Sequence, residues 1–492
     1  MLSNVMFRAV IVGVLICYAV AFFDKRHRSV KLGGCEDEDC GEEVCITDFL
    51  LQNDPAGARN ASEVFDVFPD GVQSFAGYAA VNTTAKNKLF FWYVPAMNGD
   101  KDAPLLIWLQ GGPGGSSLFG MFAEMGPFLV EDDGSLTKRP VGWNEKYSMI
   151  FIDNPVGAGF SYTDTEDGYC TDTKTQVSAQ LYEMMQQFYQ VFPEQLTNKL
   201  FITGESYAGH YVPGLGHYIF TENNKLQTRV GGGLETDAVV IPLAGVAIGD
   251  GWIDPHSHLG AYPDMLFNLG LLDHNERAVV RDYVTRSQHA IEQGDYYGAF
   301  TVWDEMINGD IYPYPNYYHN VTGSLDYDNF MNTVEPADLG NYYPFVTAAA
   351  TRRGIHAGST PYGGGGNQCE MHLLDDFMVS FKQEVEVLAD NMKVLIYSGQ
   401  LDVIIGAALT EAMMPSLGWS GSERFHRARK SVWRITPQDT DVAGYAKQYD
   451  TLTQVVVRGA GHLVPYDQPE RALDMLVKWI EDIPFENIVN PE

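Results

Sequence analysis

Ser206 stands at a predicted turn between a strand and a helix, in the segment KLFITGESYAGHYVP (residues 199–213). Residues 200–203 are apolar, and Gly204 and Ala208 flank the serine two positions away on either side. Side chains this small permit a sharp turn that presents the hydroxyl at the end of a sheet, as in a nucleophile elbow, although Ala208 stands where glycine is usual. The first amides of the following helix would point to the place where negative charge develops. The segment predicts nucleophilic catalysis by Ser206; the alternative is a glycine-rich turn with an incidental serine.

A serine nucleophile needs a general base and a group that orients the base, and two later segments offer them. The predicted strand 394–397 leads into a loop that carries Asp402, and the predicted strand 454–457 leads into a loop that carries His462. Both side chains follow the carboxyl end of a strand, where open α/β sheets collect their ligands. The order serine, aspartate, histidine along the chain is that of α/β-hydrolases. We therefore predict a triad of Ser206, His462 and Asp402.

Short apolar strands alternate with helices around these segments. Predicted strands cover residues 105–109, 149–153, 200–203, 243–248, 394–397 and 454–457. Runs that are apolar throughout are typical of parallel strands buried on both faces. A helix with one apolar stripe, from Val177 to Phe192, lies between two of them. Residues 64–94 alternate instead and predict antiparallel strands. Together these patterns predict an α/β-hydrolase fold with a mostly parallel central sheet.

Residues 254–390 break this rhythm, because helical stretches there alternate with loops rich in aromatic residues. The segment separates Ser206 from Asp402, as a lid inserted into the core would. We predict a core formed by residues 63–253 and 391–492, with a largely helical lid in 254–390. His256 and His258 form an HxH pair in this lid, but no matching partner motif for a metal follows, and we predict no metal site.

Four motifs together resemble one known family. They are WLQGGPGGSS (108–117), FIDNPVGAGFSY (151–162), GESYAG (204–209) and GAGHLVPYDQP (459–469). In this order they resemble the serine carboxypeptidases, most closely the vitellogenic-like carboxypeptidases of animals, and the resemblance extends over residues 65–485. It implies an α/β-hydrolase fold with a lid, a serine-dependent reaction that needs no metal or organic cofactor, and peptide or protein substrates.

The resemblance also implies roles for residues around the predicted triad. The oxyanion hole would be formed by the backbone amides of Gly112 and Tyr207, and the substrate carboxylate would be bound by Gln110, Gly111, Glu124 and Glu205. Two positions depart from the commoner family pattern, since Gln110 replaces asparagine and Gly115 replaces cysteine. Without the resemblance, Glu124 would be interpreted as a solvated charge on a helix. The glycines of 111–115 lack the Gly-Lys-Ser/Thr ending of a phosphate loop.

Two carboxyl groups that share one site cannot both ionise at low cost, so the pKa of one of them rises. A protonated pair of Glu124 and Glu205 would donate a hydrogen bond to the substrate carboxylate, and a deprotonated pair would repel it. We therefore expect an acid optimum for the removal of amino acids from peptides and proteins with a free C-terminus. The alternatives are acyl transfer or ester hydrolysis on the same scaffold, and a non-catalytic binding or chaperone protein that keeps the fold.

The composition suits a large folded protein without nucleic-acid partners. Apolar residues make up 45% of the 492 residues, which permits an extensive core. Lysine and arginine number 32 against 64 aspartate and glutamate residues, for a net charge of −32. A nucleic-acid-binding protein needs a basic surface, so this charge excludes that class and also disfavours anionic membranes. The sequence does not decide between a monomer and a homodimer.

The N-terminus carries a predicted secretory signal. Arg8 precedes an apolar run over residues 9–23, and small residues at 19–21 offer a cleavage site, so we predict a signal peptide in residues 1–21. The run is short for a membrane span, although the basic residues that follow keep a signal anchor open. Residues 24–62 are polar and without periodicity, and we predict a flexible segment or a pro-region over residues 22–62. No membrane span is expected after cleavage, and the mature chain would be secreted or held in a lysosomal or endosomal lumen.

Export exposes a chain to glycosylation and oxidation. Asn60, Asn82 and Asn320 each begin an Asn-X-Ser/Thr sequon. Beyond the signal, cysteines stand at positions 35, 40, 45, 170 and 369. In an oxidising lumen these five are candidates for disulfides. Their odd number leaves one cysteine unpaired or paired between chains, and the sequence leaves the connectivity open.

Overall fold

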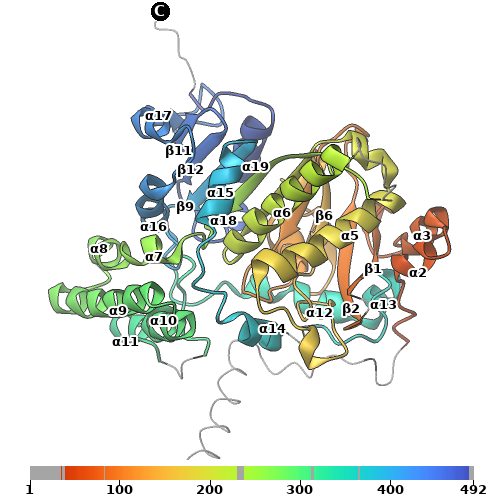
Figure 1. Ribbon diagram of the computed structural model, residues 1–492, viewed down its shortest axis with the longest axis horizontal. Helices are drawn as coiled ribbons and strands as arrows, with labels where there is room; N and C mark the ends of the chain where they lie inside the picture. The colour runs from red at the N-terminus through yellow and green to blue at the C-terminus, as the bar shows by residue number, and fades with distance from the viewer. Residues whose placement is uncertain are drawn as a thin grey trace, which may run out of the picture.

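A ten-stranded sheet forms the centre of the fold, with the strand order β1–β2–β6–β3–β7–β8–β9–β12–β11–β10 (Figure 1). Its strands are β1 (Phe75–Asn82), β2 (Asn87–Val94), β3 (Leu105–Leu109), β6 (Ser148–Ile152), β7 (Leu200–Glu205), β8 (Leu243–Gly249), β9 (Lys393–Gly399), β10 (Ser431–Trp433), β11 (Gly444–Tyr449) and β12 (Leu452–Val457). The computed structural model describes residues 35, 39–82, 84–229, 238–311, 315–363 and 366–486. The predicted signal peptide lies outside these residues. None of the helices within these ranges combines the length and the apolar character that crossing a bilayer requires.

The middle of the sheet is parallel and its margins are antiparallel. Each neighbouring pair in the run β6–β3–β7–β8–β9–β12 is parallel, whereas β1, β2, β10 and β11 pair with their neighbours antiparallel. This confirms the predicted α/β-hydrolase architecture. Because β7, β8, β9 and β12 are consecutive neighbours and share one direction, the loops that follow these four strands meet along one edge of the sheet.

Both faces of the sheet are buried, as the apolar runs predict. Side chains of a strand alternate between faces, so Ile107 of β3 packs with α5 (Ser178–Val191) and α6 (Ala208–Arg229), while Trp108 packs on the other face with α19 (Pro469–Ile480). All five residues of β3 are buried. A helix layer on each face leaves the strand ends as the accessible part of the sheet.

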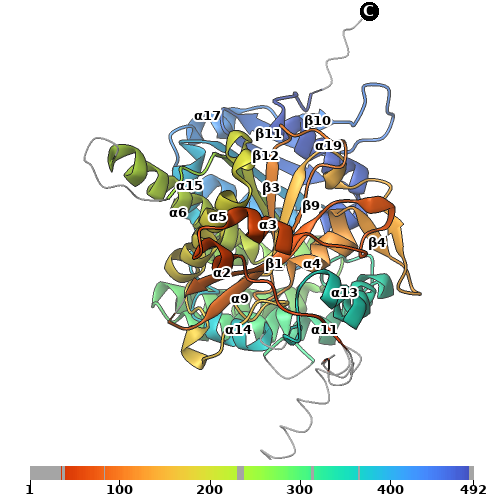
Figure 2. The ribbon, with the colours of Figure 1, turned by 90° about the vertical axis from the view of Figure 1, so that its right-hand side faces the viewer.

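The described residues between β8 and β9 form helices and loops. The helices are α7 (Pro255–Leu259), α8 (Tyr262–Asn268), α9 (His274–Glu292), α10 (Tyr296–Trp303), α11 (Tyr317–Thr322), α12 (Tyr342–Thr347), α13 (Ala349–Gly354), α14 (Gly366–Leu373) and α15 (Lys382–Ala389). Figures 1 and 2 show α9, α11, α13 and α14 along the lower side of the molecule. α15 instead packs against α6 and β9. The inserted segment therefore ends with a helix that covers the sheet.

Residues 46–62 form two short helices where the sequence predicts a flexible segment. α2 (Ile46–Leu50) buries Ile46 completely, and the Asp54 side chain caps α3 (Pro55–Ser62) by accepting a backbone hydrogen bond. Figure 2 shows both helices lying over β1 and α5, against which they pack. The prediction is therefore wrong for residues 46–62, because a helix cap and contacts with distant strands stabilise helices too short to show a periodic pattern.

Candidate active site

Ser206 occupies a tight turn between β7 and α6. Its φ of 64° lies in the left-handed region, which is uncommon for residues other than glycine, asparagine, aspartate and histidine. The Ser206 amide donates to the Gly249 carbonyl at 3.0 Å, and the Trp252 amide donates to the Ser206 carbonyl at 2.9 Å. A Cβ atom on Gly204 would lie 2.8 Å from the Cβ atom of Ala208, so the turn needs the small residues that surround it. The structure has the strand–turn–helix geometry of a nucleophile elbow.

Asp402 and His462 meet in the loops that follow β9 and β12. Nδ1 of His462 lies 2.9 Å from Oδ2 of Asp402, and both side chains are buried. Oδ1 of Asp402 also accepts the Ile405 amide at 3.1 Å. With Nδ1 engaged in this way, Nε2 is the imidazole atom left to exchange a proton with a nucleophile. Since β7, β9 and β12 end at the same edge of the sheet, these two loops reach the edge that carries Ser206.

The charge of His462 depends on the carboxyl groups around it. Burial disfavours the imidazolium, but the charge and the hydrogen bond of Asp402 outweigh burial and raise the pKa of His462 to about 9. Asp328 and Glu124 add further negative charge. Burial raises the pKa of each of these two carboxyls to about 7, so in acid both are neutral and no longer favour the imidazolium. The pKa of His462 therefore falls as these two neighbours take up protons, while Asp402 continues to favour the imidazolium.

Asp250 belongs to the same cluster, although the sequence analysis did not single it out. Its Oδ1 atom accepts the Gly399 amide at 2.8 Å. Its carboxyl also hydrogen-bonds to that of Asp402, and burial together with the Asp402 charge raises the pKa of Asp250 well above its ordinary value. Asp250 therefore holds the proton of this pair, and its O–H group donates a hydrogen bond to Asp402. The sequence offered no signal for the contact, because it depends on the adjacency of β8 and β9.

The potential metal ligands near the site form hydrogen bonds with one another. One ligand atom each from Asp250, Asp402 and His462 lies within 4.8 Å of the other two, a spacing that a cation would tolerate. The hydrogen bonds from His462 and Asp250 to Asp402 account for this proximity. The two histidines of the HxH pair have different partners. Nε2 of His256 lies 3.2 Å from Oε1 of Glu292, whereas the buried ring of His258 packs against Trp252. We assign the cluster to hydrogen bonding.

The loop after β3 lies directly against the elbow. A Cβ atom on Gly111 would lie 2.5 Å from the Cβ atom of Ser206 and 2.7 Å from the amide nitrogen of Tyr207. The next residue, Gly112, has a φ of 114°, which glycine adopts without strain. The Tyr207 hydroxyl donates to Asp376 at 2.8 Å and so anchors the residue after the nucleophile. The structure thus brings the loop that carries Gly111 and Gly112 into contact with Ser206 and the Tyr207 amide, as the amides of Gly112 and Tyr207 would need in order to serve one oxyanion.

Glu205 and Glu124 form a buried pair of acids beside the elbow. Glu124 is completely buried, and Glu205 has 1% of its surface exposed. Nε2 of Gln110 donates to Oε1 of Glu205 at 2.7 Å, and Nε1 of Trp108 donates to Oε1 of Gln110 at 2.9 Å. The carboxyls of Glu124 and Glu205 hydrogen-bond to each other, which requires a proton on one of them. Three of the four residues expected to bind a carboxylate, Gln110, Glu124 and Glu205, therefore form one connected network.

The acid pair is protonated over a wide pH range. Burial raises the pKa of Glu124 to about 7, and burial together with the Glu124 charge raises the pKa of Glu205 well above its ordinary value. The helical turn Gly120–Met125 that carries Glu124 is closed by Arg139, whose Nε donates to the Gly126 carbonyl at 2.9 Å. The interpretation of Glu124 as a solvated helix charge is therefore wrong, because the turn faces the protein interior.

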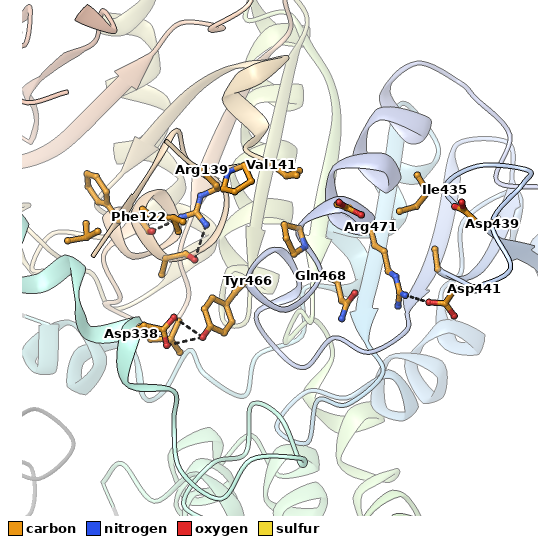
Figure 3. Close-up of a pocket in the computed structure, with 18 residues that line it drawn as sticks. Phe122, Arg139, Val141, Asp338, Ile435, Asp439, Asp441, Tyr466, Gln468 and Arg471 are labelled. Carbon is orange, nitrogen blue, oxygen red and sulfur yellow. Dashed lines mark hydrogen bonds and ion pairs between the residues drawn. The ribbon is translucent and has the colours of Figure 1, made fainter. Parts of the chain in front are cut away.

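A cavity of about 720 Å³ opens next to the His462 loop (Figure 3). Figure 3 shows Arg139 and Arg471 on opposite walls, with Tyr466 between them. The Tyr466 hydroxyl donates to Asp338 at 3.0 Å. Tyr466 also lines a smaller hollow that includes His462. The cavity is thus adjacent to the triad rather than centred on it, and Tyr466 stands between the cavity and the histidine.

The three asparagines of the sequons lie at the surface. Asn60 is in α3, Asn82 ends β1 and Asn320 is in α11, and all three are exposed. Their side chains are therefore accessible to glycosylation.

Known proteins similar to this chain agree with the geometry. The chain matches the serine carboxypeptidase family over residues 67–482. It is 39% identical over 459 residues to the probable serine carboxypeptidase CPVL of Homo sapiens, with 93% of each chain covered. It is 36% identical over 450 residues to the venom serine carboxypeptidase of Apis mellifera, covering 91% of this chain and 93% of the relative. The vitellogenic carboxypeptidase of Aedes aegypti is 35% identical over 444 residues, with 90% of each chain covered.

Among solved structures, the fold is similar to that of a prohormone-processing carboxypeptidase of Saccharomyces cerevisiae. The TM-score is 0.73 at 22% identity, and the match covers 86% of this chain and 96% of the yeast chain. At this identity the likeness concerns the fold, and it agrees with the α/β-hydrolase architecture. The family match spans most of the sequence, and the relatives extend over nine-tenths of it. The chain therefore belongs to the serine carboxypeptidase family.

Proposed function

We propose that this serine carboxypeptidase removes C-terminal amino acids from peptides and proteins, with Ser206 as the nucleophile, His462 as the general acid and base, and Asp402 as the group that orients His462. The observation that carries the proposal is the buried acid pair of Glu205 and Glu124, which begins one residue before the nucleophile. A pair of protonated acids at this place suits a substrate that ends in a carboxylate. An ester of the same size has no terminal carboxylate for the two acids to bind.

In the proposed reaction, the Ser206 hydroxyl attacks the carbonyl of the last peptide bond while Nε2 of His462 accepts its proton. The amides of Gly112 and Tyr207 stabilise the oxyanion of the tetrahedral intermediate. His462 then protonates the departing amino acid, and water hydrolyses the acyl-enzyme with the same imidazole as base. Asp402, 2.9 Å from Nδ1, keeps the imidazole in the tautomer that each step needs. Every step uses side chains and amides of this chain.

The substrate carboxylate would bind to Glu205, Glu124, Gln110 and the Gly111 amide. Protonated carboxyls donate hydrogen bonds to it, whereas a deprotonated pair repels it. Because the pKa of Glu124 is raised to about 7, the pair keeps its protons in acid and begins to lose them as the pH rises through about 7. Affinity for a carboxylate-terminated substrate should therefore be highest in acid.

This pH dependence gives a test that separates peptidase from esterase action. For an N-blocked dipeptide with a free carboxylate, we expect KM to be about tenfold higher at pH 8 than at pH 5, because each pH unit above the pKa costs a factor of ten in the binding-competent form. For the methyl ester of the same dipeptide, KM should change little. Initial rates of amino-acid and methanol release, at constant ionic strength, measure both values.

Glu124→Gln is the matched control, because its amide stays neutral and can still donate at both pH values. We expect the rise in KM to be much smaller in this variant. Parallel changes in KM for the acid and the ester in the wild-type enzyme would show that the pair does not recognise the carboxylate. Turnover of the ester with no release of amino acid from the peptide would instead favour an esterase or acyltransferase.

A second prediction concerns Asp250, which donates a hydrogen bond to Asp402. Asp250→Asn should keep most of the activity, because an amide can also donate to Asp402. Asp250→Leu should lower kcat by about 10- to 100-fold, with little change in KM, because a hydrogen bond to a charged group is lost. Steady-state kinetics and melting temperatures of both variants measure these effects. Equal loss of kcat in the two variants, or a change confined to KM, would contradict a positioning role.

We also propose where the protein works and what the inserted segment does. The Cys35–Cys40 disulfide, the exposed Asn60, Asn82 and Asn320, and the acid pair all suit an oxidising and acidic compartment, such as the lysosomal or endosomal lumen or the cell exterior. Residues 254–390 would act as a lid that shapes the substrate pocket. The contact of this segment with His462, whose backbone amide donates to the Asp328 carbonyl at 2.7 Å, supports this role.

A further inference from the structure

Two buried cysteines, Cys170 and Cys369, have no part in the proposed reaction. Cys170 has 2% of its surface exposed and Cys369 has 1%. Cys170 lies just before the helical turn Thr173–Val177, and Cys369 lies in α14. Burial raises the pKa of both thiols, that of Cys170 to about 12. Neither side chain is therefore a thiolate that could act as a nucleophile or bind a metal.

The segments that carry these cysteines lie side by side. Tyr169, directly before Cys170, stacks on His372 with the ring centroids 4.9 Å apart. Glu166 forms an ion pair with the same imidazole at 3.3 Å. Cys369 precedes His372 by three residues in α14, so both side chains leave the same face of that helix. The face of α14 that meets Tyr169 therefore also carries Cys369.

Contacts between the two segments continue after the cysteines. The Thr173 hydroxyl donates to Asp376 at 2.6 Å, and Lys174 forms an ion pair with Glu384 at 2.8 Å. The partners follow one another in the same order along both segments. These contacts fix the relative position of the two segments, so the chain near Cys170 and the chain near Cys369 are held together from both sides.

The two sulfurs also share their surroundings. Cys170 is close enough to Cys369 that a charge on its sulfur would raise the pKa of the Cys369 thiol. A charge on either sulfur would likewise raise the pKa of the buried Tyr211 hydroxyl. They therefore belong to one packed site beside Tyr211. The structure has Cys45, Cys170 and Cys369 as free, buried thiols, and Cys45 lies elsewhere, with Thr47 and Lys88 as its neighbours.

We propose that Cys170 and Cys369 are joined by a disulfide in the mature protein, and that Cys45 stays a free thiol. The two thiols give up two protons and two electrons as the S–S bond forms, and a protein or small-molecule disulfide accepts them and is reduced to two thiols. The Cys35–Cys40 bond indicates that the chain meets such an oxidant. Cys45 then accounts for the odd number of cysteines beyond the predicted signal.

The bond would fasten a segment that supports the elbow. Asp376, seven residues after Cys369, accepts the hydrogen bond of the Tyr207 hydroxyl at 2.8 Å. The carbonyl of Phe377 accepts Nε1 of Trp252 at 2.9 Å. Because the disulfide closes a long loop of the chain, we expect its removal to lower the melting temperature by about 5 °C.

Peptide mapping of the full-length secreted protein tests the proposal directly. The protein is unfolded in iodoacetamide without reductant, digested and analysed by mass spectrometry. We expect one pair of peptides joined through Cys170 and Cys369, which separates on reduction, and complete alkylation of Cys45. Alkylated Cys170 and Cys369 in the unreduced protein, or a link from either of them to Cys45, would overturn the proposal.

Serine variants give an independent measurement. Cys170→Ser, Cys369→Ser and the double variant each remove the same bond, so all three should lower the melting temperature by the same amount. Cys45→Ser is the matched control for a buried thiol, and it should keep the Cys170–Cys369 peptide pair. If the melting temperature of the double variant fell by the sum of the two single decreases, the two thiols would act separately. The map of the wild-type protein decides the question even where a variant fails to fold.

Discussion

Ser206→Ala should abolish the release of C-terminal amino acids, with kcat lower by about 10⁵- to 10⁶-fold, as for the loss of a serine nucleophile in other triads. The variant removes only the hydroxyl, so no acyl-enzyme can form. The alanine keeps the Cβ atom and with it the strained φ of 64°, and the fold should be unchanged. Release of the last residue from an N-blocked dipeptide, together with labelling by a serine-directed phosphonate, measures the effect.

Ser206→Gly is the companion variant, because it removes the hydroxyl and also the strain. Glycine adopts a positive φ without cost, so this variant should be as inactive as Ser206→Ala but should melt about 2–4 °C higher. Thermal unfolding of both variants against the wild type measures the difference. The assignment of Ser206 would be contradicted if Ser206→Ala kept activity within tenfold of the wild type. It would also be contradicted if the phosphonate labelled another serine of this variant and thereby abolished its remaining activity.

Gly111→Ala should have the second-largest effect, and for a different reason. Its Cβ atom would lie 2.5 Å from the Cβ atom of Ser206 and 2.7 Å from the amide nitrogen of Tyr207, closer than side chains approach in folded proteins. The loop must therefore move away from the elbow, and the amides of Gly112 and Tyr207 can no longer face one oxyanion. We expect kcat to fall by about 10²- to 10³-fold. Peptide and ester substrates should be affected equally, because both pass through the same oxyanion.

The control for Gly111→Ala is Gly340→Ala. Gly340 is exposed, and a Cβ atom built there meets no atom within 4 Å, so this variant should keep wild-type kinetics. A Gly111→Ala enzyme with normal kcat would show that the loop after β3 does not contribute to the oxyanion hole. An effect on the peptide alone would show that the substitution disturbs the binding of the substrate carboxylate by Gly111 and leaves the oxyanion hole intact.

The central sheet and the elbow could be predicted because their determinants are local. Buried parallel strands are apolar throughout, and a sharp turn needs small residues beside the serine, so a few consecutive letters carry the information. The loops of Asp402 and His462 could be placed at one edge because each follows a strand of this type. The order of the strands in the sheet then brings the two side chains to 2.9 Å from each other.

Features that depend on distant segments could not be predicted in this way. Asp250 reaches Asp402 only because β8 and β9 are neighbours. Glu124 lies in a short helical turn whose burial results from packing against the sheet. α2 and α3 are too short for a periodic pattern and are stabilised by contacts with β1 and α5. In each case the local sequence permits several environments, and tertiary contacts select one of them.

Folding of this protein takes up protons. Burial raises the pKa of Glu124 and of Asp328 to about 7 and that of Asp153 to about 6, above the ordinary carboxyl values that the unfolded chain would show. From about pH 4 to pH 7 the folded chain therefore holds protons that the unfolded chain has released, and the free energy of unfolding falls as the pH rises. His462, with a pKa raised to about 9, continues this trend, whereas His258, with a pKa lowered to about 4, opposes it in acid. A move from an acidic to a neutral compartment would thus lower both the free energy of unfolding and the affinity for a substrate carboxylate. Acidity would therefore favour the native state and substrate binding together.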